Sequence, residues 1–243
     1  MAANAPPELR GYDARYKREF RIQILYYNPR TFLIIDKPYD VRIDGPNDES
    51  PTIQDILNRS FPYHCEGTNK IRLVHQLDHV TSGVHVWGLD RIATRHACSL
   101  FEQRKVRKTY TALVGGWLQR DESVIEAPIA EMPNDDRKRM CVGTPDNPGR
   151  PAKTHLRVIR RGYMRFPGSG RVIRVTLCEL KPESGRRHQL RVHMAGIGHA
   201  IVGDVLYEKP FSTDSPRTML HANKLFMPLP VEGDINIVSV NRG

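Results

Sequence analysis

Residues 73–83 read Leu-Val-His-Gln-Leu-Asp-His-Val-Thr-Ser-Gly and lie near the end of the first third of a 243-residue chain. An apolar run carries one carboxylate, Asp78, into a Thr-Ser-Gly turn, and a second apolar run, Val84 to Leu89, follows. Apolar runs on both sides of a turn predict two strands with a charged group at the bend. Asp78 is therefore either part of the hydrogen bonding of a turn or a reactive carboxylate at the rim of a core.

Strand patterns dominate the rest of the chain. We predict strands at residues 22–27, 31–36, 109–114, 153–161, 171–180, 219–225 and 233–240. Helices are predicted at residues 51–61 with Ser50 as the N-cap, at 91–105 with Asp90 as the N-cap, and from Ser184 to about Gly196. Residues 127–152 hold five prolines and predict a loop-rich excursion. Without a regular βαβ alternation, this order indicates an α+β fold with a mixed, mostly antiparallel sheet.

The chain is basic, with 37 Lys and Arg against 27 Asp and Glu, a net charge of +10. The positive charge gathers at residues 15–21, 104–108, 137–139, 157–161 and 186–187. Clustered positive charge favours an anionic partner, nucleic acid before a membrane surface, although a solvated basic surface has the same composition. We expect residues 1–21 to form a basic arm without regular structure, and residues 22–243 to form one catalytic domain.

Several classes of protein are disfavoured. The four cysteines are scattered without a Cys-x-x-Cys pair, so neither a zinc site nor a disulfide framework is predicted, and a reducing compartment fits. No apolar run approaches the roughly 20 residues of a membrane span. The N-terminus lacks an apolar signal core, and acidic residues interrupt its arginines, which disfavours a transit peptide. We expect a cytoplasmic protein, with mitochondrial and nuclear locations left open.

Neither a metal site nor a serine nucleophile is indicated. His188 and His193 are five residues apart, so on a helix their side chains diverge by about 140°. His75 and His79 flank Asp78 on a strand and turn, not at the i, i+4 spacing of a zinc helix. No Gly-x-Ser-x-Gly elbow is present.

Arg191 is a candidate partner for Asp78. In the predicted helix, Leu190, Met194 and Ile197 form the buried stripe, and Arg191 lies about 100° from Leu190, at its edge. A guanidinium there can reach a buried anion while its stem packs on the core. Such a pair keeps a half-buried aspartate ionised, as a nucleophile or base requires. A purely structural ion pair, or an Asp78 bonded only to turn amides, remains the alternative.

Tyr110 is the third candidate. It follows the basic run at residues 104–108, and an aromatic ring beside phosphate-binding cations suits an extruded nucleotide. Packing within the sheet is the alternative reading of a strand tyrosine.

Taken in order, these segments resemble the RluA-type pseudouridine synthases, which isomerise uridine in ribosomal and transfer RNA. Residues 75–83 are similar to the signature His-Arg-Leu-Asp-x-x-Thr-Ser-Gly, residues 33–38 to the first family motif, and residues 108–115 to the Lys-x-Tyr-x-Ala strand. Further matches follow at residues 184–193, 199–207 and 220–222. The resemblance runs from about residue 22 to about residue 230.

The resemblance implies a pseudouridine synthase fold with flanking helices and a central active-site cleft. It assigns Asp78 as the catalytic aspartate, Arg191 as its salt-bridge partner and Tyr110 as the ring packed against the flipped uracil. Asp78 attacks the ribose C1′ or removes a C2′ proton to give a glycal, and both routes stay open. The uracil then rotates and rebonds through C5, with Tyr110 assisting removal of the C5 proton. Neither metal nor cofactor is implied.

RNA contacts are expected at Gln76, Lys108 and Arg187. Gln76 departs from the family pattern, because it stands where the signature has arginine and lacks the charge and the planar fork. Base extrusion then relies on other groups, or the substrate is already unstacked. The chain also leaves no room for the accessory RNA-binding domain of many members, so we expect affinity to come from the basic face and the arm. The alternatives are an RNA-binding protein that retains the fold without the chemistry, and a basic scaffold protein for other anions.

Overall fold

The computed structural model describes residues 6–46, 50–65, 70–137, 139–208, 214–229 and 233–239. The chain folds into two compact units. One comprises Met1–Arg107 together with Ala222–Gly243, and the other comprises Lys108–His221. Each unit combines strands with at least one helix, which confirms the α+β class.

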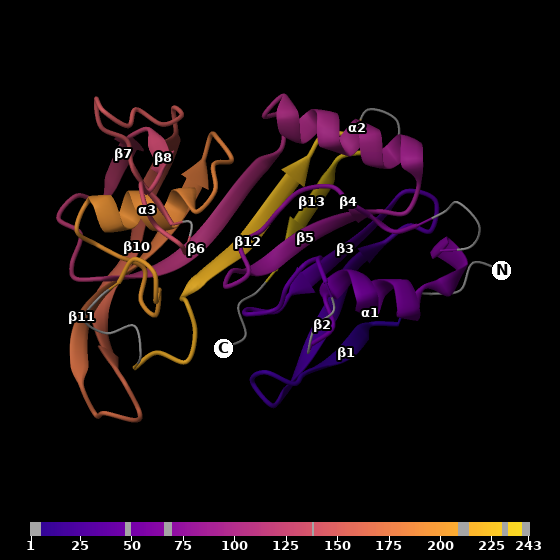
Figure 1. Cartoon of the computed structure of the whole chain (residues 1–243), viewed down its shortest axis with the longest axis horizontal. Coiled ribbons are helices and arrows are strands. Elements are labelled where there is room, and N and C mark those ends of the chain that lie inside the picture. The colour runs from indigo at the N-terminus through magenta and orange to yellow at the C-terminus, as the bar shows by residue number, and fades with distance from the viewer. Residues whose placement is uncertain are drawn as a thin grey trace. The chain divides into compact units, whose positions relative to one another are not determined.

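The first unit is built on a sheet whose order is β1, β2, β3, β5, β12 (Figure 1). These strands are Glu8–Asp13, Arg18–Tyr27, Phe32–Lys37, Ser82–Gly88 and Leu220–Met227. Two further strands join it, because β4 (Arg72–Leu73) pairs with β5 and β13 (Ile235–Val238) pairs with β12. Neighbours from β1 to β5 are antiparallel, as expected.

Two helices complete this unit, α1 (Ile53–Ser60) and α2 (Arg91–Glu102), with a short 3₁₀ turn, η1 (Pro62–Cys65), after α1. Strand β3 is buried on both sides. Its Leu33 and Ile35 join the apolar cluster that contains α1, whereas Phe32 and Ile34 join the cluster that contains α2. Successive strand residues point to opposite faces, so one apolar strand holds two helices in place.

Of the two predicted N-cap residues, one caps its helix and the other does not. Asp90 caps α2 as predicted, accepting hydrogen bonds from the backbone N–H groups of Ile92 and Ala93. The prediction for α1 is wrong, because Thr52 is its N-cap and forms a capping box with Asp55. The hydroxyl of Ser50 instead donates to Asp13 Oδ1 at 2.8 Å.

The irregular arm expected at residues 1–21 is wrong for residues 8–13 and 18–21, which lie in strands. Residues 8–13 form β1 and pair in register with β2, although residues 1–5 lie outside the described residues. The apolar pattern is weak because only Leu9 is a buried apolar side chain on β1. Gly11 adds no side chain, and a Cβ there would lie 2.3 Å from the Phe20 ring. That residues 22–243 act as one catalytic domain stays a prediction.

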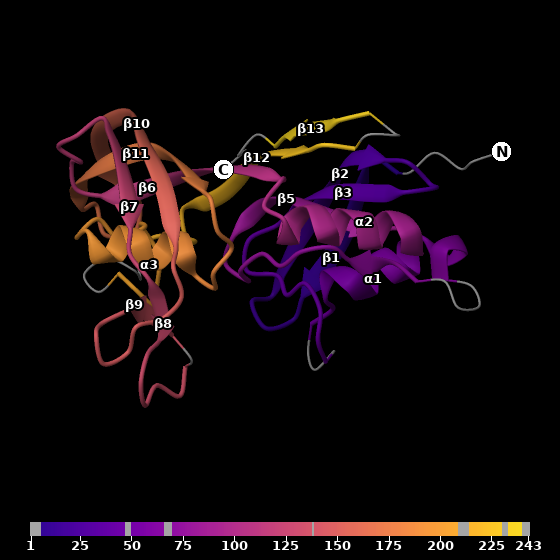
Figure 2. The same cartoon turned by 90° about the horizontal axis from the view of Figure 1, so that it is seen from above.

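The second unit has four antiparallel strands in the order β6, β11, β10, β7. They are Arg107–Gly115, Val172–Pro182, Lys153–Arg165 and Glu122–Glu126. The predicted excursion at residues 127–152 contains a small separate ladder of β8 (Ile129–Glu131) and β9 (Met140–Val142). Helix α3 (Gln189–Gly196) lies against this unit's sheet (Figure 2).

Helix α3 begins later than predicted. His188 adopts a left-handed conformation (φ 54°), which a helix interior does not allow, so Ser184 to Arg187 form a turn before it. The predicted buried stripe holds for Leu190 and Met194, but Ile197 is 40% exposed. Arg191, predicted at the edge of the stripe, is 2% exposed.

Candidate active site

The segment that carries Asp78 connects β4 to β5 and is attached to the core through His75. The backbone N–H of Val86 on β5 donates to His75 Nε2 at 3.2 Å, and His85 Nε2 donates to the His75 carbonyl at 3.0 Å. The His75 ring also stacks on Phe101 of α2, with ring centroids 4.5 Å apart. The acceptor role of Nε2 places the proton of a neutral His75 on Nδ1. The residue three positions before Asp78 is therefore fixed by a strand and a helix.

The turn after Asp78 is fixed as well. The N–H of Thr81 donates to the Asp78 carbonyl at 3.0 Å, and Thr81 is buried. Gly83 has a φ of +113°, and a Cβ at this position would lie 2.3 Å from the carbonyl oxygen of Ala222 on β12. Only glycine allows both the backbone angle and this close approach. The Thr-Ser-Gly turn thus holds Asp78 against two strands of the first unit.

Lys37 adds an attachment that the sequence did not reveal. Its side chain is fully buried at the end of β3, and Nζ donates to the carbonyls of Pro38, Val41 and His79 at 2.8, 2.9 and 3.0 Å. Burial lowers the pKa of Lys37 to about 7, and the carboxylates of Asp40 and Asp78 partly oppose that shift. Lys37 therefore links the 33–38 segment to the backbone immediately after Asp78.

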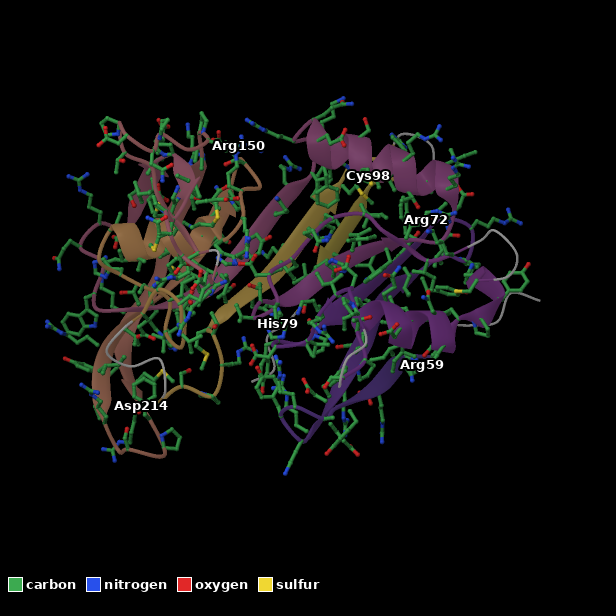
Figure 3. All side chains as sticks on the ribbon, viewed as in Figure 1. Arg59, Arg72, His79, Cys98, Arg150 and Asp214 are labelled. Atoms are coloured by element: carbon green, nitrogen blue, oxygen red, sulfur yellow. The ribbon has the colours of Figure 1, made fainter. Side chains whose placement is uncertain are left out.

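Side chains around Asp78 differ in exposure. Asp78 is half-buried, and Gln76 is exposed, so the amide of Gln76 is accessible to a ligand. His79 (Figure 3) is half-buried, and burial together with the nearby Lys37 charge lowers its pKa to about 4. The imidazole is therefore neutral at physiological pH. It lines a cavity of about 280 Å³ together with Arg15, Tyr16, Arg42 and other residues of this unit.

In the second unit, Arg191 forms a buried ion pair with Asp204. Arg191 Nε and Nη2 donate to the two oxygens of Asp204 at 2.7 and 2.8 Å, and the two side chains are 2% and 0% exposed. The Tyr207 ring centroid lies 5.1 Å from the guanidinium carbon. A bidentate pair fixes the plane of the guanidinium. Sequence reasoning missed Asp204, although it falls within the family-like segment 199–207.

A chain of buried and part-buried hydrogen bonds holds α3 on β10. Gln189 Nε2 donates to the Lys153 carbonyl at 2.9 Å and to Thr154 Oγ1 at 3.0 Å. Thr154 in turn bonds His193 Nδ1 at 2.9 Å, while His193 Nε2 donates to the Ala127 carbonyl at 3.0 Å. Sequence reasoning missed the role of these residues. Polar side chains at buried positions of a helix were the pattern that could have indicated it. The network fixes the helix that positions Arg191.

The two histidines of this segment contact different residues. His188 Nδ1 bonds the Tyr207 hydroxyl at 2.8 Å, whereas His193 faces Thr154. Within the described parts of the chain, no group of three or more His, Cys, Asp or Glu side chains could hold a metal ion.

Strand β6 places Lys108 and Tyr110 on one face, because they are two residues apart. Tyr110 is 9% exposed and lies opposite Leu180 on β11. Burial lowers the pKa of Lys108, and Arg187 is exposed in the turn before α3. The structure thus gathers Lys108, Tyr110, Arg187 and Arg191 in the second unit and Gln76 and Asp78 in the first. That they act at one uridine stays a prediction.

Comparison with known proteins identifies the family. The family model for RNA pseudouridylate synthase matches residues 31–196. The RNA pseudouridylate synthase domain-containing protein 1 of Mus musculus is 36% identical over 220 residues, covering 86% of this chain and 69% of that protein. The dual-specificity RNA pseudouridine synthase RluA of Yersinia pestis is 34% identical over 215 residues, covering 86% of this chain and 94% of that protein.

A solved structure agrees with these sequence relatives. The human RNA pseudouridylate synthase domain-containing protein 1 aligns with a TM-score of 0.77 and 32% identity, covering 90% of this chain and 83% of that one. Among the helices of the described residues, none is long and apolar enough to cross a membrane. The chain belongs to the RluA family of RNA pseudouridine synthases, which are isomerases.

Proposed function

We propose that the protein converts uridine to pseudouridine in a structured RNA, ribosomal or transfer RNA, with Asp78 as the essential carboxylate. The observation that carries the proposal is the attachment of the Asp78 segment on both sides. His75 is fixed to β5 and α2, and the His79 carbonyl is bonded to buried Lys37. A surface turn needs no such framework. A reactive group does, because small displacements of catalytic groups cost large factors in rate.

Arg191 and Tyr110 complete the proposed chemistry. The bonds to Asp204 engage Nε and Nη2 of Arg191, and a guanidinium carries five N–H donors in all. We assign a further donor of Arg191 to the Asp78 carboxylate. Tyr110 packs against the flipped uracil. Asp78 then either attacks C1′ or removes the C2′ proton, and the C1′–N1 bond breaks. The uracil rebonds to C1′ through C5, which loses its proton, while Asp78 is released or returns the proton to C2′. The isomerisation calls for no metal and no cofactor.

Substrate contacts are assigned to three further residues. Lys108 and Arg187 supply positive charge for phosphates from the unit that holds Tyr110. Exposed Gln76 hydrogen-bonds near the extruded base without adding charge. The four cysteines are free thiols, which fits the reducing cytoplasm as the site of action.

The test replaces Asp78 with Asn and with Ala and supplies transcripts of ribosomal and transfer RNA that contain 5-tritiated uridine. Wild-type protein should release tritium, and both variants should release none while their circular dichroism spectra match the wild type. Asp146→Asn, a change of the same kind at an exposed loop residue, is the matched control and should keep full activity. Tritium release by either Asp78 variant would contradict the assignment.

A second candidate, an RNA-binding protein without the chemistry, is favoured by the missing charge at Gln76. The same assay separates the two, because a binding protein retains the transcripts on a filter and releases no tritium.

A further inference from the structure

We propose that the outer ends of β10 and β11 form a second RNA-binding surface. This surface comprises residues 160–174. It is called the arm, and it is separate from the basic arm expected at residues 1–21. The arm continues past the neighbouring strands, because β7 pairs with β10 only at residues 153–157 and β6 pairs with β11 only at residues 175–180 (Figure 1). The inference rests on the proposed function in one respect: the bound RNA is the RNA that is modified.

One face of the arm is packed and the other is open. After a bulge between Val158 and Arg160, the register pairs Tyr163 with Arg174, and residues directly opposite each other share a face. On the packed face, Met164, Ile173 and Val175 join an apolar cluster with Phe166 and Val202. The open face carries Arg161, Tyr163, Arg165, Val172 and Arg174.

Tyr163 is an exposed ring held in a fixed position. Tyr163 is 66% exposed, and its ring packs edge to face on the Trp117 ring, with ring centroids 5.3 Å apart. Trp117 is itself anchored, since its Nε1 donates to the Gly162 carbonyl at 3.0 Å. The Arg174 guanidinium lies 5.5 Å from the Trp117 ring. Exposed aromatic rings fixed by their neighbours are stacking platforms for unpaired bases.

The positive charge on this face is only partly neutralised. Arg161 pairs with Asp121 at 2.6 Å, and Arg171 in the turn lies 3.9 Å from Asp214. Among the residues that the structure describes, no carboxylate pairs with Arg165 or Arg174. Two unpaired guanidinium groups beside an open tyrosine suit phosphates on either side of a stacked base. A protein or membrane partner would call for a larger apolar patch.

The arm shares a face with Tyr110. Arg174 and Leu180 are six residues apart on β11, and every β11 residue between them is paired with β10 in sequence, because the bulge lies on β10; their side chains therefore point to the same side. Leu180 is the residue opposite Tyr110. Six residues of strand span about 20 Å. A structured RNA is large enough to reach Tyr110 with one base and the arm with flanking nucleotides.

The experiment measures binding of a fluorescein-labelled 20-nucleotide single-stranded RNA to the full chain by fluorescence anisotropy. Stacking of one base on Tyr163 predicts that Tyr163→Ala raises Kd by about 5- to 150-fold, whereas Tyr163→Phe, which keeps the ring, should bind like wild type. Loss of two phosphate contacts in the double variant Arg165→Ala/Arg174→Ala should lower the slope of log Kd against log salt by about 1.4 to 1.8. The control Arg91→Ala/Arg95→Ala removes two exposed arginines from α2 and should leave the slope unchanged.

Two results would overturn the proposal: an unchanged Kd for Tyr163→Ala, or equal salt slopes for the arm and the control double variants. Melting temperatures of all variants confirm that each remains folded. Because binding is measured without turnover, the arm and the activity are judged separately. Weaker binding by the arm variants, with no tritium release from wild type, would support RNA binding by the arm and contradict the proposed function. Tritium release from wild type, with unchanged binding by the arm variants, would do the reverse.

Discussion

Buried Lys37 offers a sharp test of the framework around Asp78. Its ammonium has three N–H donors, and three backbone carbonyls surround Nζ within 3.0 Å. Burial nevertheless lowers its pKa from 10.5 to about 7. The change to study is Lys37→Met, which keeps an unbranched apolar chain and removes the titrating group.

The sign and size of the effect follow from linkage. Between about pH 7 and pH 10.5 the unfolded chain holds a proton on Lys37 that the folded protein releases, so the stability conferred by Lys37 rises with pH. Below pH 7 both states are protonated and the penalty is constant. Each unit of pKa difference corresponds to about 1.4 kcal/mol, so a shift of this size gives about 5 kcal/mol across the window.

The orphaned carbonyls of Lys37→Met oppose this gain. Each buried acceptor left without a donor costs about 1–3 kcal/mol, but that cost does not change with pH. The difference in unfolding free energy between wild type and Lys37→Met therefore combines an offset that does not depend on pH with a defined slope against pH. We expect it to move in favour of wild type by about 1.4 kcal/mol per pH unit between pH 7 and pH 10, and to be flat from pH 6 to pH 7.

Urea unfolding followed by tryptophan fluorescence measures this difference. The sequence has two tryptophans, so a Trp117→Phe background leaves Trp87, which is fully buried in the first unit, as the only fluorophore. Tyrosines and cysteines titrate in both proteins, and their contributions cancel in the difference. A flat difference from pH 7 to pH 10 would refute the reasoning, because it would show that the three carbonyls keep the ammonium charged.

Two further predictions concern the same segment. Gly83→Ala places a side chain on a left-handed backbone and against Ala222, so we expect a loss of about 2–6 kcal/mol in unfolding free energy. The control is Gly45→Ala, because Gly45 has a similar φ but open space around it. This variant should lose only about 1–3 kcal/mol. If both glycine variants melt alike, contact with β12 does not fix the turn. Gln76→Arg restores the charge of the family signature and should steepen the salt slope of RNA binding by about 0.7 to 0.9, which anisotropy measures; an unchanged slope would place residue 76 away from phosphate.

Strands and helices that are encoded by a few neighbouring residues could be predicted from the sequence. Strand β3 is apolar on both faces, and Asp90 stands immediately before an amphipathic helix, so both could be recognised from a few neighbouring residues. Strand β1 could not be, because only Leu9 is a buried apolar residue on it and its order comes from pairing with β2. The late start of α3 depends on the left-handed conformation of His188, which no periodicity encodes.

For the site residues, the sequence predicted their identity but not the contacts that hold them in place. Motif resemblance selected Asp78, Tyr110 and Arg191, yet it did not reveal what fixes them. Arg191 was expected at the edge of a helix stripe, but its ion pair with Asp204 allows full burial. That partner lies thirteen residues downstream, and only the fold brings it near. Likewise, the basic run at 157–161 was visible in the sequence, but the bulge in β10 decides which arginines share a face with Tyr163.

The distribution of buried polar groups bears on whether Asp78 is a turn residue or a reactive one. A buried polar side chain is tolerated only when its hydrogen bonds are satisfied, and an apolar residue in its place is commonly no less stable. Lys37 and half-buried His75 nevertheless flank Asp78, and Gln189 and His193 hold the helix of Arg191. Each of the four bonds backbone atoms of a neighbouring segment, which fixes positions rather than filling space. A turn that served stability alone would need none of them, whereas an aspartate and an arginine that must hold their positions during a reaction require such support.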